Sequence, residues 1–254
     1  MRAKKSLGQH FLSSKHIVSA IVSTADVSAS DTVLEVGPGK GVLTEAILEK
    51  AARVIAVEKD DRLISFLEEK FSREIANGKL ILVHDDILRF NLSSYQLQTT
   101  GYKLIANIPY YITGQLFKLF LESSVQPSLM VLLIQKEVAV RIAAKDKKES
   151  LLSISVKIYG VPRYVKSVPA HYFSPKPRVD SAILSVEHIA SPFRSDAEQK
   201  KFFAIARKGF AHKRKLLRSN LGCETKVFKT CGIPEKARAE NCTIENWLCL
   251  SKHL

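Results

Sequence analysis

The stretch Thr32-Val33-Leu34-Glu35-Val36-Gly37-Pro38-Gly39-Lys40-Gly41 joins an apolar, β-branched run to a turn that contains three glycines. β-Branched residues favour strands, and the apolar residues at positions 42, 43, 46 and 47 have the spacing of one helix face. A strand, a glycine turn and a helix open the βαβ unit of nucleotide-binding α/β folds, because glycine lets a ligand approach the backbone closely. The stretch therefore predicts an α/β fold with a ligand site at this turn.

The spacing of the glycines narrows the kind of ligand. Gly37, Gly39 and Gly41 follow the pattern G-x-G-x-G, whereas dinucleotide-binding turns have G-x-G-x-x-G, which disfavours an NAD-dependent dehydrogenase. Gly41 also follows Lys40 at the place where the Walker loop of nucleoside-triphosphate sites has Ser or Thr. A tight turn without a ligand is the alternative interpretation of these residues.

Two acidic residues end the next two predicted strands. Glu58 follows the apolar run Arg53–Val57, and an acidic residue at this strand tip can accept hydrogen bonds from both hydroxyls of a ribose. Asp86 follows the run Leu80–Val83, where a carboxylate can accept from the exocyclic amino group of an adenine. We expect both at the ligand site, because the carboxyl ends of parallel strands share one edge of the sheet. Solvated strand ends are the alternative.

The segment Lys103–Tyr111 predicts a buried strand that ends in Asn107, Ile108, Pro109 and Tyr110. The chain must turn there, because proline cannot donate to a ladder and disfavours helix at the preceding residue. The Asn107 side-chain oxygen and the Ile108 carbonyl oxygen, beside the Tyr110 ring, suit a planar base with an exocyclic amino group. A surface turn capped by the asparagine is the alternative.

A second aromatic residue lies in the loop His171–Ser181, between the predicted strands Arg163–Val168 and Ala182–Val186, which we expect as a hairpin at the sheet edge. Phe173 in this loop is a candidate for the second face of an aromatic clamp, and packing into the core is its alternative role. The N-terminal run Ser6–Leu12 is too apolar for a free tail, so we expect it to pack on the body of the protein.

The net charge of +14 is concentrated toward the C-terminus. Residues 187–254 carry 14 Lys and Arg against 7 Asp and Glu, half of the total excess in about a quarter of the chain. We expect one helix here with an aromatic face and a basic face, suited to the phosphate backbone of a nucleic acid. Its predicted cations are Arg207, Lys208, Lys213, Arg214, Lys215 and Arg218.

The cysteines and the apolar runs indicate in which cellular compartment we expect the protein. Cys223, Cys231, Cys242 and Cys249 include no C-x-x-C pair, so we expect reduced structural thiols and no metal site. No apolar run approaches the length of a membrane span, and no signal-peptide core follows the first residues. We therefore expect a cytoplasmic protein without a membrane partner.

Taken together and in this order, the motifs resemble those of the ribosomal RNA adenine dimethyltransferases of the KsgA type. The resemblance covers nearly the whole chain and implies an α/β fold, a Rossmann-like S-adenosylmethionine-dependent methyltransferase sheet with a small, mainly helical C-terminal domain. It implies a methyltransferase domain over 1–188 and a basic RNA-binding domain over 189–254. The matching motifs are Leu7–Leu12, Glu35–Gly41, Glu58, Asp86–Leu88, Asn107–Tyr110, Gln135–Glu137 and Phe173–Ser181.

The resemblance also implies roles for single residues. His10 and Leu12 lie where the family's N-terminal motif touches the cofactor, and Gly37 lies where the family contacts its methionine part. Glu58 would bind the ribose hydroxyls and Asp86 the adenine amino group, in agreement with their strand-tip positions. Asn107 would serve both the cofactor pocket and catalysis, together with Ile108, Pro109, Tyr110 and Phe173. Many members have Asn in place of His10, which leaves open whether that contact uses the side chain or the backbone.

The implied activity is dimethylation of N6 on two adjacent adenosines near the 3′ end of small-subunit rRNA. The implied partner is the immature small ribosomal subunit, and the implied state is a monomer without a metal. Two alternatives remain open at this point. One is the related methyltransferase that modifies large-subunit rRNA and gives macrolide resistance. The other is a nonenzymatic RNA-binding assembly or transcription factor on the same fold.

Overall fold

The computed structural model describes residue 4 and residues 7–95, 97, 101–144 and 148–254. It consists of two compact units, one formed by Met1–Ala139 with Arg163–Ile189 and the other by Val140–Pro162 with Ala190–Leu254. From the sequence we expected a single division after residue 188, so the assignment of 140–162 to the C-terminal unit is an addition. The tertiary contacts explain it, because the Glu149 N–H donates to the Glu240 carbonyl and Tyr159 packs against Phe193.

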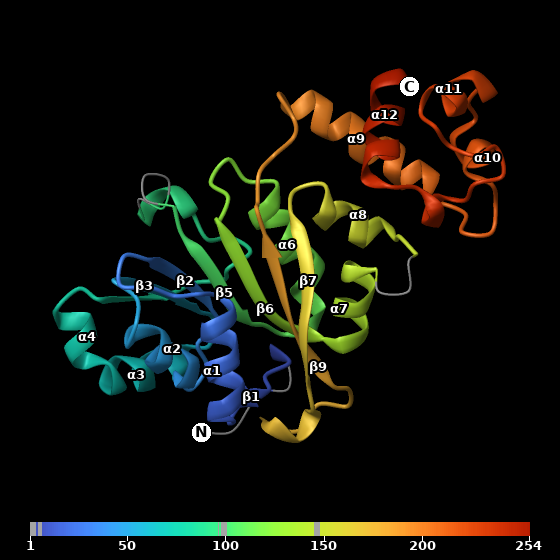
Figure 1. Ribbon diagram of the computed structural model, residues 1–254. Coiled ribbons are helices and arrows are strands. Elements are labelled where there is room, and N and C mark those ends of the chain that lie inside the picture. Colours follow the sequence, from blue (N-terminus) through green and yellow to red (C-terminus); the bar gives the residue numbers. More distant parts are fainter. Residues whose placement is uncertain (1–3, 5–6, 96, 98–100, 145–147) are drawn as a thin grey trace. The chain divides into compact units, whose positions relative to one another are not determined.

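The first unit is built on a seven-stranded sheet with the order β4-β3-β2-β5-β6-β9-β7 (Figure 1). The neighbouring pairs from β4 to β6 are parallel, and β9 runs antiparallel to β6. The strand order reverses between β2 and β5, which is the switch point where open α/β sheets bind ligands. The strands are β2 (Thr32–Val36), β3 (Arg53–Glu58), β4 (Leu80–His84), β5 (Lys103–Asn107), β6 (Leu129–Gln135), β7 (Val161–Val168) and β9 (Ser181–Glu187).

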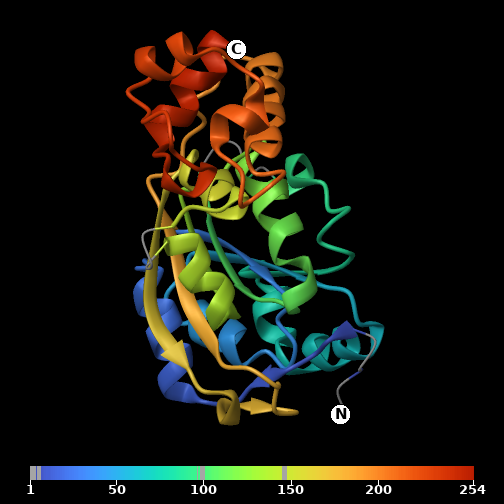
Figure 2. The ribbon, with the colours of Figure 1, turned by 90° about the vertical axis from the view of Figure 1, so that its right-hand side faces the viewer.

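The predicted strands are confirmed, and so is the pairing of the last two at the sheet edge. Proline is tolerated at position 162 because β7 is an edge strand and has no partner on one side. The parallel strands read as continuous apolar runs because both faces of the sheet are covered. Figure 2 shows α1 and α6 on opposite sides of the sheet. The helices of this unit include α1 (Lys15–Thr24), α2 (Val42–Leu48), α3 (Asp61–Lys70), α4 (Ser72–Ala76) and α6 (Thr113–Leu121), while α7 (Lys136–Ala143) crosses into the second.

The N-terminal segment packs on the body, as expected for its residues from Leu7 onward; the preceding Ser6 lies outside the described residues. β1 (Phe11–Leu12) pairs antiparallel with β8 (Phe173–Ser174), so that Leu12 lies opposite Phe173. Both of these side chains belong to the same buried core. Two stretches about 160 residues apart in sequence therefore meet here.

The second unit is helical: α8 (Leu151–Lys157), α9 (Asp196–Gly209), α10 (Leu217–Leu221), α11 (Thr225–Thr230) and α12 (Ile244–His253). Trp247 on α12 is fully buried and stacks on Phe210, with ring centroids 5.2 Å apart. A side chain at Gly209 would place its Cβ 2.4 Å from the Trp247 ring, so only glycine allows α9 and α12 to pack this closely.

The expected single basic helix is wrong. α9 ends at Gly209, so only Arg207 and Lys208 lie on it, while 213–215 form a turn and Arg218 lies on α10. The chain leaves the helix because the buried glycine is followed by Phe210, whose ring turns inward onto the tryptophan of α12. All six cations are nevertheless exposed.

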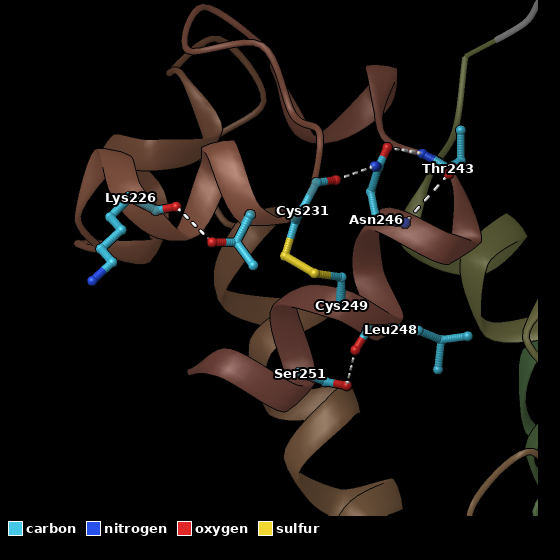
Figure 3. Close-up of a disulfide and its surroundings, with 8 residues drawn as sticks. Lys226, Cys231, Thr243, Asn246, Leu248, Cys249 and Ser251 are labelled. Atoms are coloured by element: carbon cyan, nitrogen blue, oxygen red, sulfur yellow. Dashed lines mark hydrogen bonds between the residues drawn. A yellow bond between two sulfur atoms is a disulfide. The ribbon is translucent and has the colours of Figure 1, made fainter.

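The expectation of reduced thiols is wrong for two of the four cysteines. Cys231, at the end of α11, forms a disulfide with Cys249 on α12, and their Cα atoms are 5.5 Å apart (Figure 3). Asn246 supports this junction by donating from Nδ2 to the Cys231 carbonyl oxygen at 2.9 Å. Cys223 and Cys242 are free. Sequence spacing does not reveal this pairing, because it depends on how the two helices pack.

Candidate functional site

One pocket lies at the carboxyl ends of β2, β3 and β5, beside the switch point of the sheet. Its walls come from the N-terminal segment, the glycine turn, the strand tips and the turn after β5. The structure brings all of the predicted site residues to this pocket. They are His10, Leu12, Gly37, Glu58, Asp86, Asn107, Ile108, Pro109, Tyr110 and Phe173.

Two glycines with positive φ shape the turn between β2 and α2, and Gly37 lines the pocket itself. Gly37 has φ +71°, and a Cβ there would make only an ordinary contact, 3.5 Å from the Asn107 carbonyl oxygen, so the backbone conformation rather than crowding favours glycine. Gly41 has φ +72° and precedes α2; its Cβ would lie 2.5 Å from the Phe71 ring. Any side chain at position 41 would therefore push α2 away from α3.

Glu58 is held by backbone donors at the tip of β3. Its Oε1 accepts from the N–H groups of Lys59 and Asp60, both at 2.9 Å, and its Oε2 accepts from the Gly39 N–H at 3.1 Å. A carboxylate has about four acceptor positions, so these bonds leave about one, on Oε2. Burial raises the pKa of Glu58, while the backbone bonds oppose that shift. The carboxylate is thus fixed in place with room for one further donor.

Asp86 is an ionised acceptor on the other side of the ligand site. The Lys59 ammonium donates to its Oδ2 at 2.8 Å, and the Leu88 N–H donates to its Oδ1 at 3.1 Å. The bond from Lys59 is the main cause that lowers the pKa of Asp86. Its neighbour Asp85 instead supports the turn by accepting from the Asp86 N–H at 2.7 Å.

Asn107 is the last residue of β5, and a hydrogen bond to the N-terminal segment orients its side chain. Its Nδ2 donates to the His10 carbonyl oxygen at 3.5 Å, an orientation that leaves Oδ1 as the acceptor for the pocket. Ile108 is buried, and no hydrogen bond within the described part of the chain ends on its carbonyl oxygen. Both residues line the pocket, so the end of this strand supplies two candidate acceptors.

Hydrogen bonds hold Tyr110 at its side-chain hydroxyl and at its backbone carbonyl oxygen. Its hydroxyl lies 2.8 Å from Ser181 Oγ, and its carbonyl oxygen accepts from the Thr113 hydroxyl at 2.9 Å. Burial raises the pKa of Tyr110, so its phenol stays neutral. The His10 ring lies nearly parallel to it, with centroids 6.1 Å apart and an interplanar angle of 22°, and His10 Nδ1 is 2.7 Å from the Pro175 carbonyl oxygen. The His10 side chain thus ties two loops together while its backbone meets Asn107.

The position of Phe173 is compatible with both of the roles that the sequence left open, a clamp ring and a core residue. It lines the pocket, yet it is only 5% exposed and packs in the core with Leu12. The pairing of β1 with β8 places it there. Tyr110 is therefore the more accessible of the two candidate clamp rings.

Sequence reasoning missed a polar network around the buried Asp60 carboxylate, next to the pocket residue Gln9. Gln9 donates from Nε2 to Asp60 Oδ2 at 2.9 Å, and Arg62 forms an ion pair with the same carboxylate at 2.6 Å. The Arg62 bond is the main cause that holds the pKa of Asp60 far below its usual range. Because the Asp60 N–H also binds Glu58, this network links the N-terminal segment to the predicted ribose site. No pattern of spacing in the sequence relates residues 9 and 60.

The chemistry available in this pocket is that of oriented acceptors and aromatic rings. Among the residues that the structure describes, no group of three or more His, Cys, Asp or Glu side chains is placed to hold a metal ion. Within the same residues, no helix has both the length and the apolar character to cross a membrane. The arrangement suits recognition of donor groups on a nucleoside and on a second planar base.

Comparison with known proteins identifies relatives along the whole chain. The family model "Ribosomal RNA adenine dimethylase" matches residues 1–254. A ribosomal RNA small subunit methyltransferase A from Dehalococcoides mccartyi is 42% identical over 98% of this chain and 88% of its own length. A protein of the same name from Halothermothrix orenii is 35% identical over all of this chain and 89% of its own length.

Solved structures show the same fold. A dimethyladenosine transferase from Plasmodium falciparum has a TM-score of 0.81 and 26% identity, covering 95% of this chain and 96% of that one. The 23S rRNA methyltransferase ErmE has a TM-score of 0.77 and 24% identity, covering 96% and 99%, which supports the fold alone. The fold is thus the expected Rossmann-like methyltransferase sheet with a small helical C-terminal part. The family match and the identity of the relatives show that this chain belongs to the ribosomal RNA adenine dimethylase family.

Proposed function

We propose that this protein transfers methyl groups from S-adenosylmethionine to N6 of two adjacent adenosines near the 3′ end of small-subunit rRNA. The observation that carries this proposal is the pair of acceptors at Asn107 and Ile108, beside the Tyr110 ring. They lie in the same pocket as Glu58 and Asp86. The proposed substrate is the immature small ribosomal subunit in the cytoplasm, and the proposed active form is a monomer.

The pocket fits the cofactor on two observations. Glu58 keeps about one acceptor position beyond its three backbone bonds, enough for one ribose hydroxyl; two would require a bond to be displaced. Gly37 leaves space that a Cβ would fill at the floor, where the methionine part would lie. Asp86 would accept from the adenine amino group, with Leu12 and the His10 backbone completing the wall. The bound cofactor supplies an electrophilic methyl group on a sulfonium.

Asn107 and Ile108 act on the target amino group. The lone pair of an adenine amino nitrogen is delocalised into the ring, which makes it a poor nucleophile. Acceptance of its two N–H bonds by Asn107 Oδ1 and the Ile108 carbonyl would hold the nitrogen with its lone pair directed at the methyl group. Pro109 sets the turn that places these acceptors together. Positioning of this kind accounts for a large part of many rate enhancements.

The same acceptors favour the transition state over the substrate. The amino nitrogen gains positive charge as the new bond forms, so its hydrogen bonds to fixed oxygens strengthen at that point. The acceptors do not need to reorganise, because Asn107 is already oriented by His10 and the backbone by Pro109. No general base is required for this step, since the proton can leave after the methyl has been transferred.

The aromatic rings would hold the target base. Tyr110 is braced by Ser181 and offers one face, with Phe173 at the far wall of the pocket. Stacking of a base on an aromatic ring contributes about 1–3 kcal/mol. The exposed cations of the C-terminal unit would bind the phosphate backbone elsewhere on the RNA, which makes this unit the proposed RNA-binding domain.

The variant Asn107→Ala tests the proposal. It should abolish methyl transfer at saturating cofactor while RNA binding stays largely intact, because most RNA affinity comes from cations elsewhere. The assay measures tritiated methyl transfer to immature small subunits, followed by nucleoside analysis. Asn77→Ala, an exposed asparagine after α4 and outside the pocket, serves as the matched control and should retain activity.

The products distinguish the alternatives. The wild-type protein should yield N6,N6-dimethyladenosine at two neighbouring positions, with monomethyl intermediates early in the reaction. Wild-type turnover by the Asn107 variant would contradict the mechanism. Product only in large-subunit RNA would favour the macrolide-resistance activity, and no product with any RNA would favour a nonenzymatic assembly or transcription factor.

A further inference from the structure

Tyr111 is an exposed aromatic residue at the mouth of the pocket that the proposed mechanism does not use. It follows Tyr110 directly, lines the pocket, and is 64% exposed. Its ring rests against the N-terminal segment, where a Cβ at Gly8 would lie 3.4 Å from Tyr111 Cε1. Gly8 has φ +61°, so this support also suits glycine conformationally. The ring is thus backed on one side and open on the other.

Two exposed cations lie on, or directly after, segments that line the same pocket. Lys59, which follows β3, lines the pocket together with Tyr111. Its ion-pair partner Asp86 begins the turn that the Arg89 N–H closes by donating to the Asp86 carbonyl oxygen at 2.7 Å. The Lys59 side chain is 55% exposed although it bonds to Asp86, and Arg89 is exposed on the segment after β4. We call Lys59, Arg89 and Tyr111 the rim cluster. A supported aromatic ring with adjacent cations is the combination by which proteins bind single-stranded nucleic acids, through a stacked base and neighbouring phosphates.

The position of the rim cluster determines what it can bind. If the target adenine lies on Tyr110, its phosphodiester links must leave through the mouth of the pocket, because the RNA chain cannot pass through the sheet. The nucleotide next to the target is then held near the mouth. Tyr111 directly follows Tyr110 in the chain and lines the same pocket, so both residues belong to one binding surface.

We propose that Tyr111 stacks the base next to the target adenosine while Lys59 and Arg89 bind the adjoining phosphates. This inference rests on the proposed function and adds a second base subsite to it. For a substrate with two adjacent target adenosines, this subsite holds one while the other is methylated. The subsite recognises a planar base by its face and therefore contributes affinity for a single-stranded segment rather than for a particular sequence.

The test combines an enzyme variant with an altered substrate. Small subunits are reconstituted with an rRNA segment that carries one target adenosine, and the base on either side of it is removed in turn. With wild-type protein, removal of the stacked neighbour should lower kcat/KM about 5- to 150-fold, the range expected for one stacked base. Tyr111→Ala should lose the same factor with the intact substrate, mainly through KM, and should lose nothing further with the abasic one.

Control variants separate stacking from other roles. Tyr111→Phe should restore wild-type values, because stacking requires the ring and not the hydroxyl. Phe66→Ala removes another exposed aromatic side chain, on α3 and outside the pocket, and should change nothing. The dissociation constant of S-adenosylmethionine should be the same for wild type and Tyr111→Ala.

The outcomes are distinguishable. If the losses in kcat/KM caused by Tyr111→Ala and by each abasic substrate multiply when the two changes are combined, the ring and the neighbouring base act independently. That result would overturn the inference and leave the proposed function intact. Weaker cofactor binding by Tyr111→Ala, with unchanged use of the RNA, would assign the ring to the cofactor and also overturn it. A wild-type protein that methylates no subunit would instead contradict the proposed function itself.

Discussion

Replacement of Glu35 by glutamine should remove most of the pH dependence of stability of the sheet-containing unit between pH 5 and pH 8. Glu35 lies on β2 with a 1% exposed side chain, and neither carboxyl oxygen has a hydrogen-bond partner within the described residues. Burial raises the pKa of Glu35 to about 8, and the Glu58 carboxylate acts in the same direction. Thr44 and Lys70 lower the pKa and offset only part of the rise.

The sign and size follow from proton linkage. The folded state holds the Glu35 proton up to about pH 8, whereas the unfolded chain releases it near pH 4.5. The unfolded state thus binds fewer protons between these values, and stability must fall as pH rises through that window. A difference of one bound proton between the folded and unfolded states changes the free energy of unfolding by about 1.4 kcal/mol per pH unit. The free energy of unfolding should therefore drop by roughly 3–4 kcal/mol from pH 5 to pH 8.

The assay is hydrogen exchange by mass spectrometry on peptides that cover β2 and α2, in urea at several pH values after correction for the intrinsic exchange rate. The single tryptophan, Trp247, lies in the other unit, so its fluorescence follows that unit in the same samples. Glu69→Gln, an exposed glutamate on α3, is the matched control and should keep the wild-type slope. Glu58 also has a raised pKa, and a shallow residual slope in Glu35→Gln is expected from it.

A wild-type stability that is flat or rises over this pH range would refute the reasoning. Equal slopes for wild type and Glu35→Gln would show that the carboxyl is ionised in the folded state or has a partner that compensates for its charge. A lower absolute stability of Glu35→Gln with an unchanged slope would have the same meaning, because burial of the amide alone can cause it.

Three further outcomes are expected. Glu58→Gln should weaken S-adenosylmethionine binding in calorimetry, because it loses a charge-assisted acceptor; an unchanged affinity would remove Glu58 from the site. Neutralising the turn 213–215 should flatten the plot of log RNA affinity against log salt by about 0.7 per lost phosphate contact on a single strand, and an unchanged slope would mean that the turn only faces solvent. Gly41→Ala should cost about 1–3 kcal/mol more in urea unfolding than Gly78→Ala, since both have positive φ but only the first places a Cβ within 2.5 Å of a neighbouring ring; equal costs would contradict the packing argument.

The sequence alone determined which segments form the strands of the sheet and which polar residues gather at their carboxyl ends. Runs such as Thr32–Val36 and Lys103–Asn107 are recognisable as strands because both faces of the sheet are covered, so their central residues are apolar except for Glu35. Polar residues that follow such runs must meet at one edge, which is why the sequence predicts that Glu58, Asp86 and Asn107 lie together in one pocket. These signals are local, and they are sufficient to predict a shared edge because all strands of a parallel sheet end on the same side.

Only the tertiary structure decided which distant residues touch. The antiparallel pairing of Phe11 and Leu12 with the strand at Phe173 buries the Phe173 side chain. The sequence allowed this residue either a role in the aromatic clamp or packing in the core. The bond between Gln9 and Asp60 and the disulfide between Cys231 and Cys249 have no counterpart in local spacing. The extent of the second unit likewise depends on the packing of 140–162. Each of these contacts joins segments whose separation in sequence carries no periodic signal, so their positions depend on the packing of the whole chain.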